Sequence, residues 1–127
     1  MIKHTYKSGQ MLVVLLVFII VGVAITTTAV SLVISGNIKA SKFQEGLITY
    51  NMVESGIENA LIRYLRDAAY TGETLTIGTG TVTITLTGTT TKTITADAKN
   101  GNYQRKIQAT VTDSGGVMTI TSWQEIF

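Results

Sequence analysis

Cysteine and proline are both absent from the 127 residues, and histidine occurs once, at His4. Without cysteine the chain has no disulfide and no thiolate chemistry. A single histidine excludes a multi-histidine metal site, and because His4 precedes a long apolar run it does not suggest a catalytic base. No other residues form a catalytic or ligating pattern, so we expect no enzymatic activity, no metal and no cofactor.

Charge is also scarce, since Asp, Glu, Lys and Arg make up only 14% of the residues and the net charge is +2. So small a balance does not favour nucleic acid or another polyanion as a partner. The apolar residues, in contrast, are abundant and concentrated near the N-terminus. The length suits one small domain with an added anchor.

The apolar run extends from Met11 to Ile34 and contains no charged residue, while Lys3 and Lys7 precede it. As a helix it would be roughly 36 Å long at ~1.5 Å per residue, which exceeds the ~30 Å hydrocarbon core of a bilayer. The sequence therefore predicts a transmembrane helix, to which we assign residues 10–36.

Three interpretations of this segment remain open. A secretory signal peptide could be cut near Ala29-Val30-Ser31, although residues 32–34 continue the apolar run beyond that point. An uncleaved signal anchor would keep the whole segment. In a prepilin-type segment, residues 1–9 are a basic leader that ends at Gly9, and cleavage there makes Gln10 the first residue. Glycine suits such a cut because it lets a protease approach the backbone closely.

From residue 37 onward the pattern becomes amphipathic and continues to Tyr70, where Tyr70-Thr71-Gly72 is expected to end the helix. We expect Arg63 to pair with Asp67 one turn away. The predicted apolar stripe, spaced by three or four residues, consists of Phe43, Leu47, Tyr50, Val53, Ile57, Leu61, Tyr64 and Ala68.

Residues 71–127 alternate between apolar and hydroxyl side chains, which predicts four or five antiparallel strands. Turns are expected at Gly78–Gly80, at Asn100-Gly101 and at Asp113–Gly116. The apolar face should lie on the helical stripe, and we interpret the threonine face as solvated surface. In the last strand Met118 and Ile120 are expected to face inward, and Trp123 and Phe127 near the C-terminus are expected to pack on the sheet domain. The fold class is α+β.

Two weaker patterns are interpreted as surface features. Glu54 and Glu58 stand one helical turn apart, but no catalytic partner accompanies them, so a solvated face or a subunit contact is favoured. Lys99, Arg105 and Lys106 surround Tyr103, too few charges to favour binding of a nucleic acid strand. We place them on a solvated edge strand, where Lys92 and Lys106 would discourage sheet pairing.

Two features stand out between Gly9 and Leu65. One is the leader glycine in Ser8-Gly9-Gln10, which runs directly into aliphatic residues, and the other is the helical stretch that contains Glu54, Ser55, Gly56 and Glu58. With these features the region resembles bacterial type IV pilins, most closely the PilX-like minor pilins. Major pilins usually carry glutamate at the fifth position after the cut, where this chain has Val14. PilX-like subunits often lack that glutamate, so the resemblance implies a minor subunit.

The resemblance implies a function in filament assembly. The subunit would wait in the bacterial inner membrane in a single pass, with its C-terminal head outside the cytoplasm, and would then join an extracellular pilus. Its implied partners are other pilin subunits, a prepilin peptidase and the assembly machinery. Val14, Gly22 and Ala24 would lie where helices pack together, because small residues permit close approach. The alternatives are a signal-anchored extracytoplasmic binding or adhesion domain and a secreted β domain released by signal peptidase.

Overall fold

The computed structural model describes residues 6–127 and contains one long helix and a five-stranded sheet. The chain divides into two compact units, Met1–Ser41 and Lys42–Phe127, which are described separately. Residues 1–5 of the expected leader lie outside the described residues, whereas residues 6–9 are helical. The elements are α1 (Tyr6–Arg66), β1 (Gly72–Ile77), β2 (Gly80–Thr87), β3 (Thr91–Asn100), β4 (Tyr103–Ser114) and β5 (Val117–Ile126).

In the first unit every side chain from residue 9 to residue 41 is exposed. The helix contains an 18-residue window with a mean hydropathy of 2.8, and is long and apolar enough to cross a membrane. The three consecutive threonines of this segment are satisfied within the helix, because Thr26, Thr27 and Thr28 each donate their hydroxyl to the carbonyl four residues earlier, at 2.8–2.9 Å. Such bonds lower the cost of placing hydroxyls in an apolar environment.

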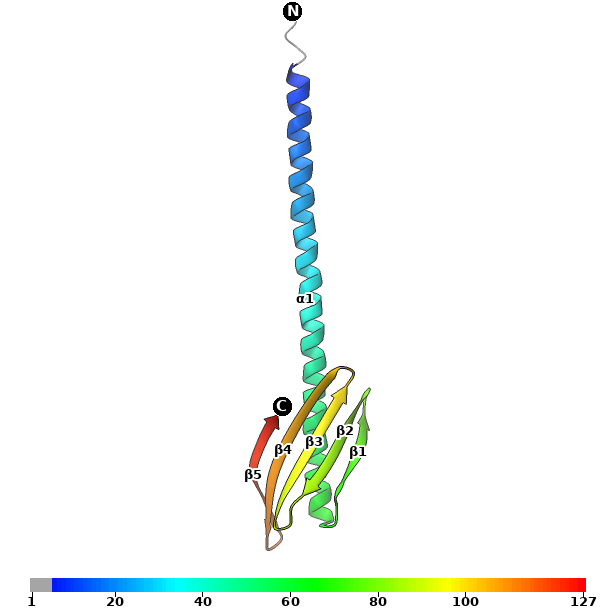
Figure 1. Ribbon diagram of the computed structural model, residues 1–127, viewed down its shortest axis with the longest axis vertical. Helices are drawn as coiled ribbons and strands as arrows, with labels where there is room; N and C mark the ends of the chain where they lie inside the picture. The colour runs from blue at the N-terminus through cyan, green and yellow to red at the C-terminus, as the bar shows by residue number, and fades with distance from the viewer. Residues whose placement is uncertain (1–5) are drawn as a thin grey trace, which may run out of the picture. The chain divides into compact units, whose positions relative to one another are not determined.

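The sheet of the second unit is an antiparallel meander in the order β1-β2-β3-β4-β5 (Figure 1). Its hairpins are tight because glycines adopt positive φ at the turns, as at Gly78 (60°), Gly101 (57°) and Gly115 (65°). One turn differs from expectation. Asn100 is the last residue of β3 and is buried, so the β3–β4 turn consists of Gly101 and Asn102.

The core lies between the inner face of the sheet and one face of the helix. In the three central strands β2, β3 and β4, buried residues alternate with more exposed ones. Burying one valine, leucine or isoleucine side chain contributes about 1.5–3 kcal/mol to the stability of a fold. The buried apolar residues are Met52, Val53, Ile57, Ala60, Leu61, Val82, Ile84, Ile94, Ala96, Ala98, Ile107, Ala109 and Val111. The α+β architecture is confirmed: an apolar N-terminal helix packs against a five-stranded antiparallel sheet.

The helical face that covers the sheet is shorter than the predicted stripe. The central residues of the predicted stripe, Val53, Ile57 and Leu61, are buried. Tyr50 and Tyr64 are half-buried. The prediction is wrong for Phe43, Leu47 and Ala68, which are exposed because the buried face of the helix extends only from Thr49 to Leu61.

The helix also ends at Arg66, before the predicted Tyr70. Asp67 ends it, since its side chain accepts a bond from the Ala69 amide (2.9 Å) and its carbonyl accepts one from the Tyr70 amide (3.0 Å). These local bonds replace the helical pattern. Gly72 starts β1 instead of capping the helix. With φ at 123°, a Cβ there would clash with the Ile84 carbonyl.

The last strand is only partly packed. Met118 contacts the core as predicted, but Ile120, Trp123 and Phe127 are exposed. Trp123 pairs with Ala109, and Ile120 with Val111, so both lie in register with inward-facing residues of β4. Both lie on β5, which is one of the two edge strands of the sheet.

Candidate functional site

The outer face of the sheet carries a continuous array of hydroxyl groups. The register pairs Thr74 with Thr83, and Thr85 with Thr95. Because neighbouring strands are ~4.8 Å apart, these side chains stand next to one another. Further members of the array are Thr76, Thr81, Thr87, Thr91, Thr93, Thr110, Thr112, Thr119 and Ser122. The sequence predicts this face from its alternation alone.

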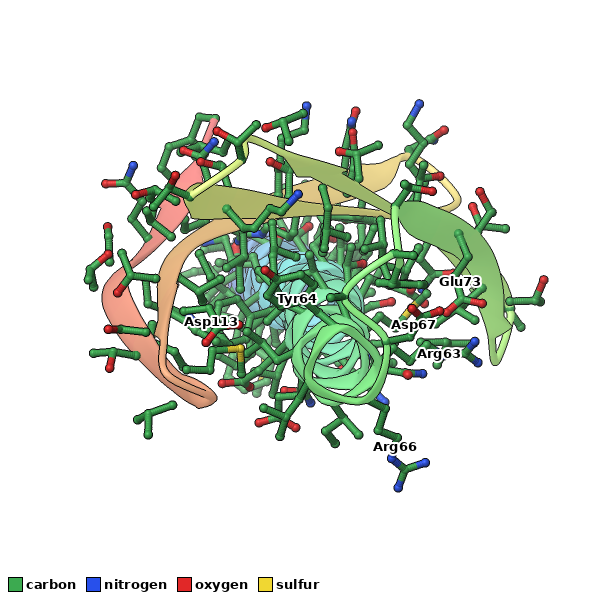
Figure 2. All side chains as sticks on the ribbon, turned by 90° about the horizontal axis from the view of Figure 1, so that it is seen from below. Arg63, Tyr64, Arg66, Asp67, Glu73 and Asp113 are labelled. Carbon is green, nitrogen blue, oxygen red and sulfur yellow. The ribbon has the colours of Figure 1, made fainter. Side chains whose placement is uncertain are left out.

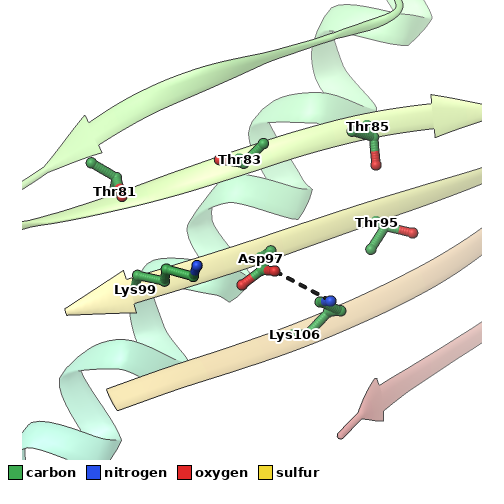
Figure 3. A pocket seen from close by; sticks show the side chains of 7 residues that line it. All are labelled: Thr81, Thr83, Thr85, Thr95, Asp97, Lys99 and Lys106. Carbon is green, nitrogen blue, oxygen red and sulfur yellow. Dashed lines mark ion pairs between the residues drawn. The ribbon is translucent and has the colours of Figure 1, made fainter. Parts of the chain in front are cut away.

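A polar hollow of about 260 Å³ lies on this face, across β2, β3 and β4. Figure 3 shows its side chains standing on the three strands. Its lining consists of Thr81, Thr83, Thr85, Thr95, Asp97, Lys99 and Lys106. The sequence did not predict this site, because no role was assigned to Asp97 and because Lys99 and Lys106 were placed on an edge strand.

The charges of the hollow are arranged around Asp97. Its carboxylate lies 3.2 Å from Nζ of Lys106 and accepts two bonds from the Gln104 amide, at 2.8 and 2.9 Å. Lys106 lies on β4, between β3 and β5, so its assignment to an edge strand is wrong. The same correction applies to Lys92 and Lys99 on β3 and to Arg105, which forms an ion pair of 2.7 Å with Glu125 on β5.

The helical residues of the pilin resemblance have one clear structural role. Gly56 is buried against β2, and a Cβ built on it would lie 2.5 Å from a methyl carbon of Val82. A side-chain-free residue is therefore what lets helix and strand approach here. Ser55 and Glu58 are exposed and Glu54 is half-buried, so the two carboxylates do not form a buried acid–base pair.

A polar network connects two hairpin turns to the helix. The Asn100 amide donates to a carboxylate oxygen of Glu45 (3.0 Å) and accepts from the Thr79 hydroxyl (3.0 Å). Thr49, which is fully buried, donates to the carbonyl of Glu45 (2.8 Å). The network satisfies polar groups that burial would otherwise penalise.

Near the C-terminal end of α1, Arg63 pairs with Glu73 of β1 at 2.9 Å and not with Asp67 as expected. Figure 2 shows Arg63 and Glu73 on the same side of the helix, with Arg66 pointing away from the sheet. The Tyr70 hydroxyl donates to Glu73 at 2.9 Å. Desolvation, reinforced by this hydrogen bond, raises the pKa of Tyr70 to about 12. These contacts join the helix end to the first strand.

Among the described residues, no group of three or more His, Asp or Glu side chains could hold a metal. Val14, Gly22 and Ala24 are exposed on the apolar segment, within the first unit. Gly9 and Gln10 lie near the start of α1. Comparison with protein-family models, with curated proteins and with solved structures finds no match to this chain. The architecture itself, an apolar N-terminal helix packed on an antiparallel sheet, is pilin-like.

Proposed function

We propose that this chain is a structural subunit of a pilus-like filament, specifically a PilX-like minor pilin, and not an enzyme. The observation that carries the proposal is the helix α1. Its N-terminal part is apolar and exposed, with a mean hydropathy of 2.8, and its C-terminal part, from Thr49 to Leu61, packs on the sheet. The same helix thus provides both a segment suited to a membrane and the support of a folded sheet.

The anchoring segment would hold the subunit in the inner membrane before assembly, with the sheet outside the cytoplasm. In the extracellular filament the apolar helices of several subunits would pack together and replace lipid as the partner of this surface. Exposed Gly22 and Ala24 permit close helix approach, and Ala24 borders a shallow apolar depression lined also by Thr28, Ala29 and Leu32. Val14 leaves this surface uncharged at the position where major pilins carry glutamate.

Cleavage after Gly9 by a prepilin peptidase would expose Gln10 as the first residue. N-terminal sequencing of the protein purified from its native host tests this step. We expect Gln10 first in the wild type, and loss of cleavage in the Gly9→Leu variant, because its side chain obstructs access to the scissile bond. An intact Met1 would identify a signal anchor, and a start near Leu32 a secreted domain. Either result in the wild type contradicts the proposal.

Assembly itself requires a separate measurement. Because the chain has no cysteine, a photocrosslinking reagent can be attached at a single introduced cysteine without background. The reagent on Ala24→Cys should crosslink to neighbouring pilin subunits in sheared filament fractions, whereas Thr121→Cys on β5 provides a matched exposed control outside the helix. Absence of the protein from filament fractions would exclude a role as a filament subunit.

A further inference from the structure

The polar hollow on β2, β3 and β4 has no part in anchoring or in helix packing, so it requires its own explanation. Its four threonines leave their hydroxyls largely uncommitted. Thr83 makes only a 3.5 Å contact with Thr74, and within the described part of the chain the hydroxyls of Thr81, Thr85 and Thr95 have no hydrogen-bond partner. Each such hydroxyl can both donate and accept a hydrogen bond, which suits a ligand that itself carries hydroxyls.

Lys99 supplies an uncompensated positive charge at the same place. Both oxygens of Asp97 are already engaged by Gln104, and one of them also by Lys106. Figure 3 shows the Asp97–Lys106 ion pair, with Lys99 beside Asp97 on β3. Lys99 itself is exposed and forms no ion pair with any described residue. The hollow therefore combines free hydroxyls with one free ammonium group.

We propose that this hollow binds an acidic sugar unit. The sugar hydroxyls would exchange hydrogen bonds with the threonines of β2 and β3, and the carboxylate would pair with the ammonium group of Lys99. A volume of about 260 Å³ lies just below the ~300–1,000 Å³ typical of ligand pockets, so it suits a single sugar ring. Every residue of the lining carries a hydroxyl or a charged group, while the threonine methyl groups offer apolar contact to the carbon atoms of a sugar ring.

A nucleic acid strand is the other polymer that a basic hollow could attract. Binding of single strands relies on aromatic side chains on which the bases stack. The lining of the hollow contains no aromatic residue, only threonine, aspartate and lysine. The hollow also offers more hydroxyl groups than a simple inorganic anion would need as hydrogen-bond donors. These features favour a sugar as the source of the negative charge.

The array of hydroxyls continues beyond the hollow, to Thr74 and Thr76 on β1 and to Thr110 and Thr112 on β4. A polymer of acidic sugars could thus contact several rows at once. Linked contacts raise the overall affinity well above that of one unit. We expect polygalacturonate to bind more tightly than free galacturonic acid, with the free sugar competing for the same hollow.

Calorimetric titration of the full chain in neutral detergent micelles tests the proposal, with polygalacturonate, free galacturonic acid and neutral galactan as ligands. We expect the acidic ligands to bind and galactan to bind at least roughly tenfold more weakly. Replacement Lys99→Gln should weaken polygalacturonate binding by roughly tenfold, the loss of one charge-assisted bond. The double replacement Thr83→Val and Thr85→Val should weaken both acidic ligands, because it removes two hydroxyls without removing charge.

Lys92→Gln is the matched control, since it removes one positive charge from the same strand at a position that pairs with the inward-facing Val111. It should leave the affinity unchanged. An equal loss in Lys99→Gln and Lys92→Gln would reveal non-specific attraction and overturn the proposal. Equal binding of galactan, tighter binding of single-stranded DNA, or phosphate binding as tight as that of galacturonic acid would each overturn it as well. None of these outcomes depends on whether the chain assembles into filaments.

Discussion

At the scale of single residues, Gly56 is a helical position that leaves no room for a side chain against the sheet. Its hypothetical Cβ would lie 2.5 Å from Val82, a fully buried and stiff β-branched residue, so Gly56→Ala must displace packed atoms. Overpacking costs about 1–3 kcal/mol. This cost opposes a helix-propensity gain of ~1 kcal/mol. We expect net destabilisation of about 1 kcal/mol, measured by urea unfolding followed through the fluorescence of Trp123, the single tryptophan.

Gly46 on the same helix provides the control for this prediction. A Cβ there would meet only the Arg105 guanidinium at 3.9 Å, an ordinary contact. Gly46→Ala should therefore be neutral or stabilise the fold by up to ~1 kcal/mol through helix propensity. If both replacements stabilise equally, the close approach at Gly56 has no energetic consequence. The residue would then owe its presence to something other than helix–sheet packing.

At the scale of elements, the Glu45–Asn100–Thr79 network connects the β1–β2 turn and the end of β3 to α1. Asn100→Ala removes both bonds and leaves two polar groups beside a buried position. We expect a destabilisation of about 1–2 kcal/mol and faster hydrogen exchange at the β1–β2 turn. The adjacent Asn102 is exposed, so Asn102→Ala should change neither. Equal effects of the two replacements would contradict a role for the network.

The strands and their faces could be predicted from the sequence because alternation in residues such as Thr83, Ile84 and Thr85 has only one arrangement on a half-buried sheet. The length of helix that the sheet covers could not be predicted in this way. An apolar period marks which side of a helix faces a core, but not where the partner sheet ends. Phe43 and Leu47 therefore continue the pattern in the sequence and are nevertheless exposed.

The polar hollow could not be predicted for a different reason. It depends on which residues of β2, β3 and β4 stand opposite one another, as Thr81 does to Lys99, and Asp97 to Lys106. The register follows from the exact residues that form each turn, and at Asn100-Gly101 the expected turn was displaced by one residue. Such a displacement changes every pair between β3 and β4, including Asp97 with Lys106, so local signals do not fix the set of side chains that meet.

At the scale of the whole molecule, the distribution of buried residues indicates that the two units have different requirements for stability. All core residues, from Met52 to Val111, belong to the unit Lys42–Phe127, whereas the side chains from residue 9 to residue 41 are exposed and mostly apolar. We expect a fragment of residues 42–127 to fold cooperatively in water, because it retains the entire core. The full chain should require detergent, because its apolar helix has no partner in water.

Circular dichroism and sedimentation of the fragment, with and without detergent, check this expectation. A β-rich spectrum, a single unfolding transition and a monomeric species without detergent are the expected results. Val53→Ala in the same fragment should lower the unfolding midpoint, since it removes a fully buried side chain, whereas Leu65→Ala should not, since Leu65 is exposed. A fragment that unfolds or aggregates unless residues 9–41 are restored would show that the apolar helix is needed for folding and is not only an anchor.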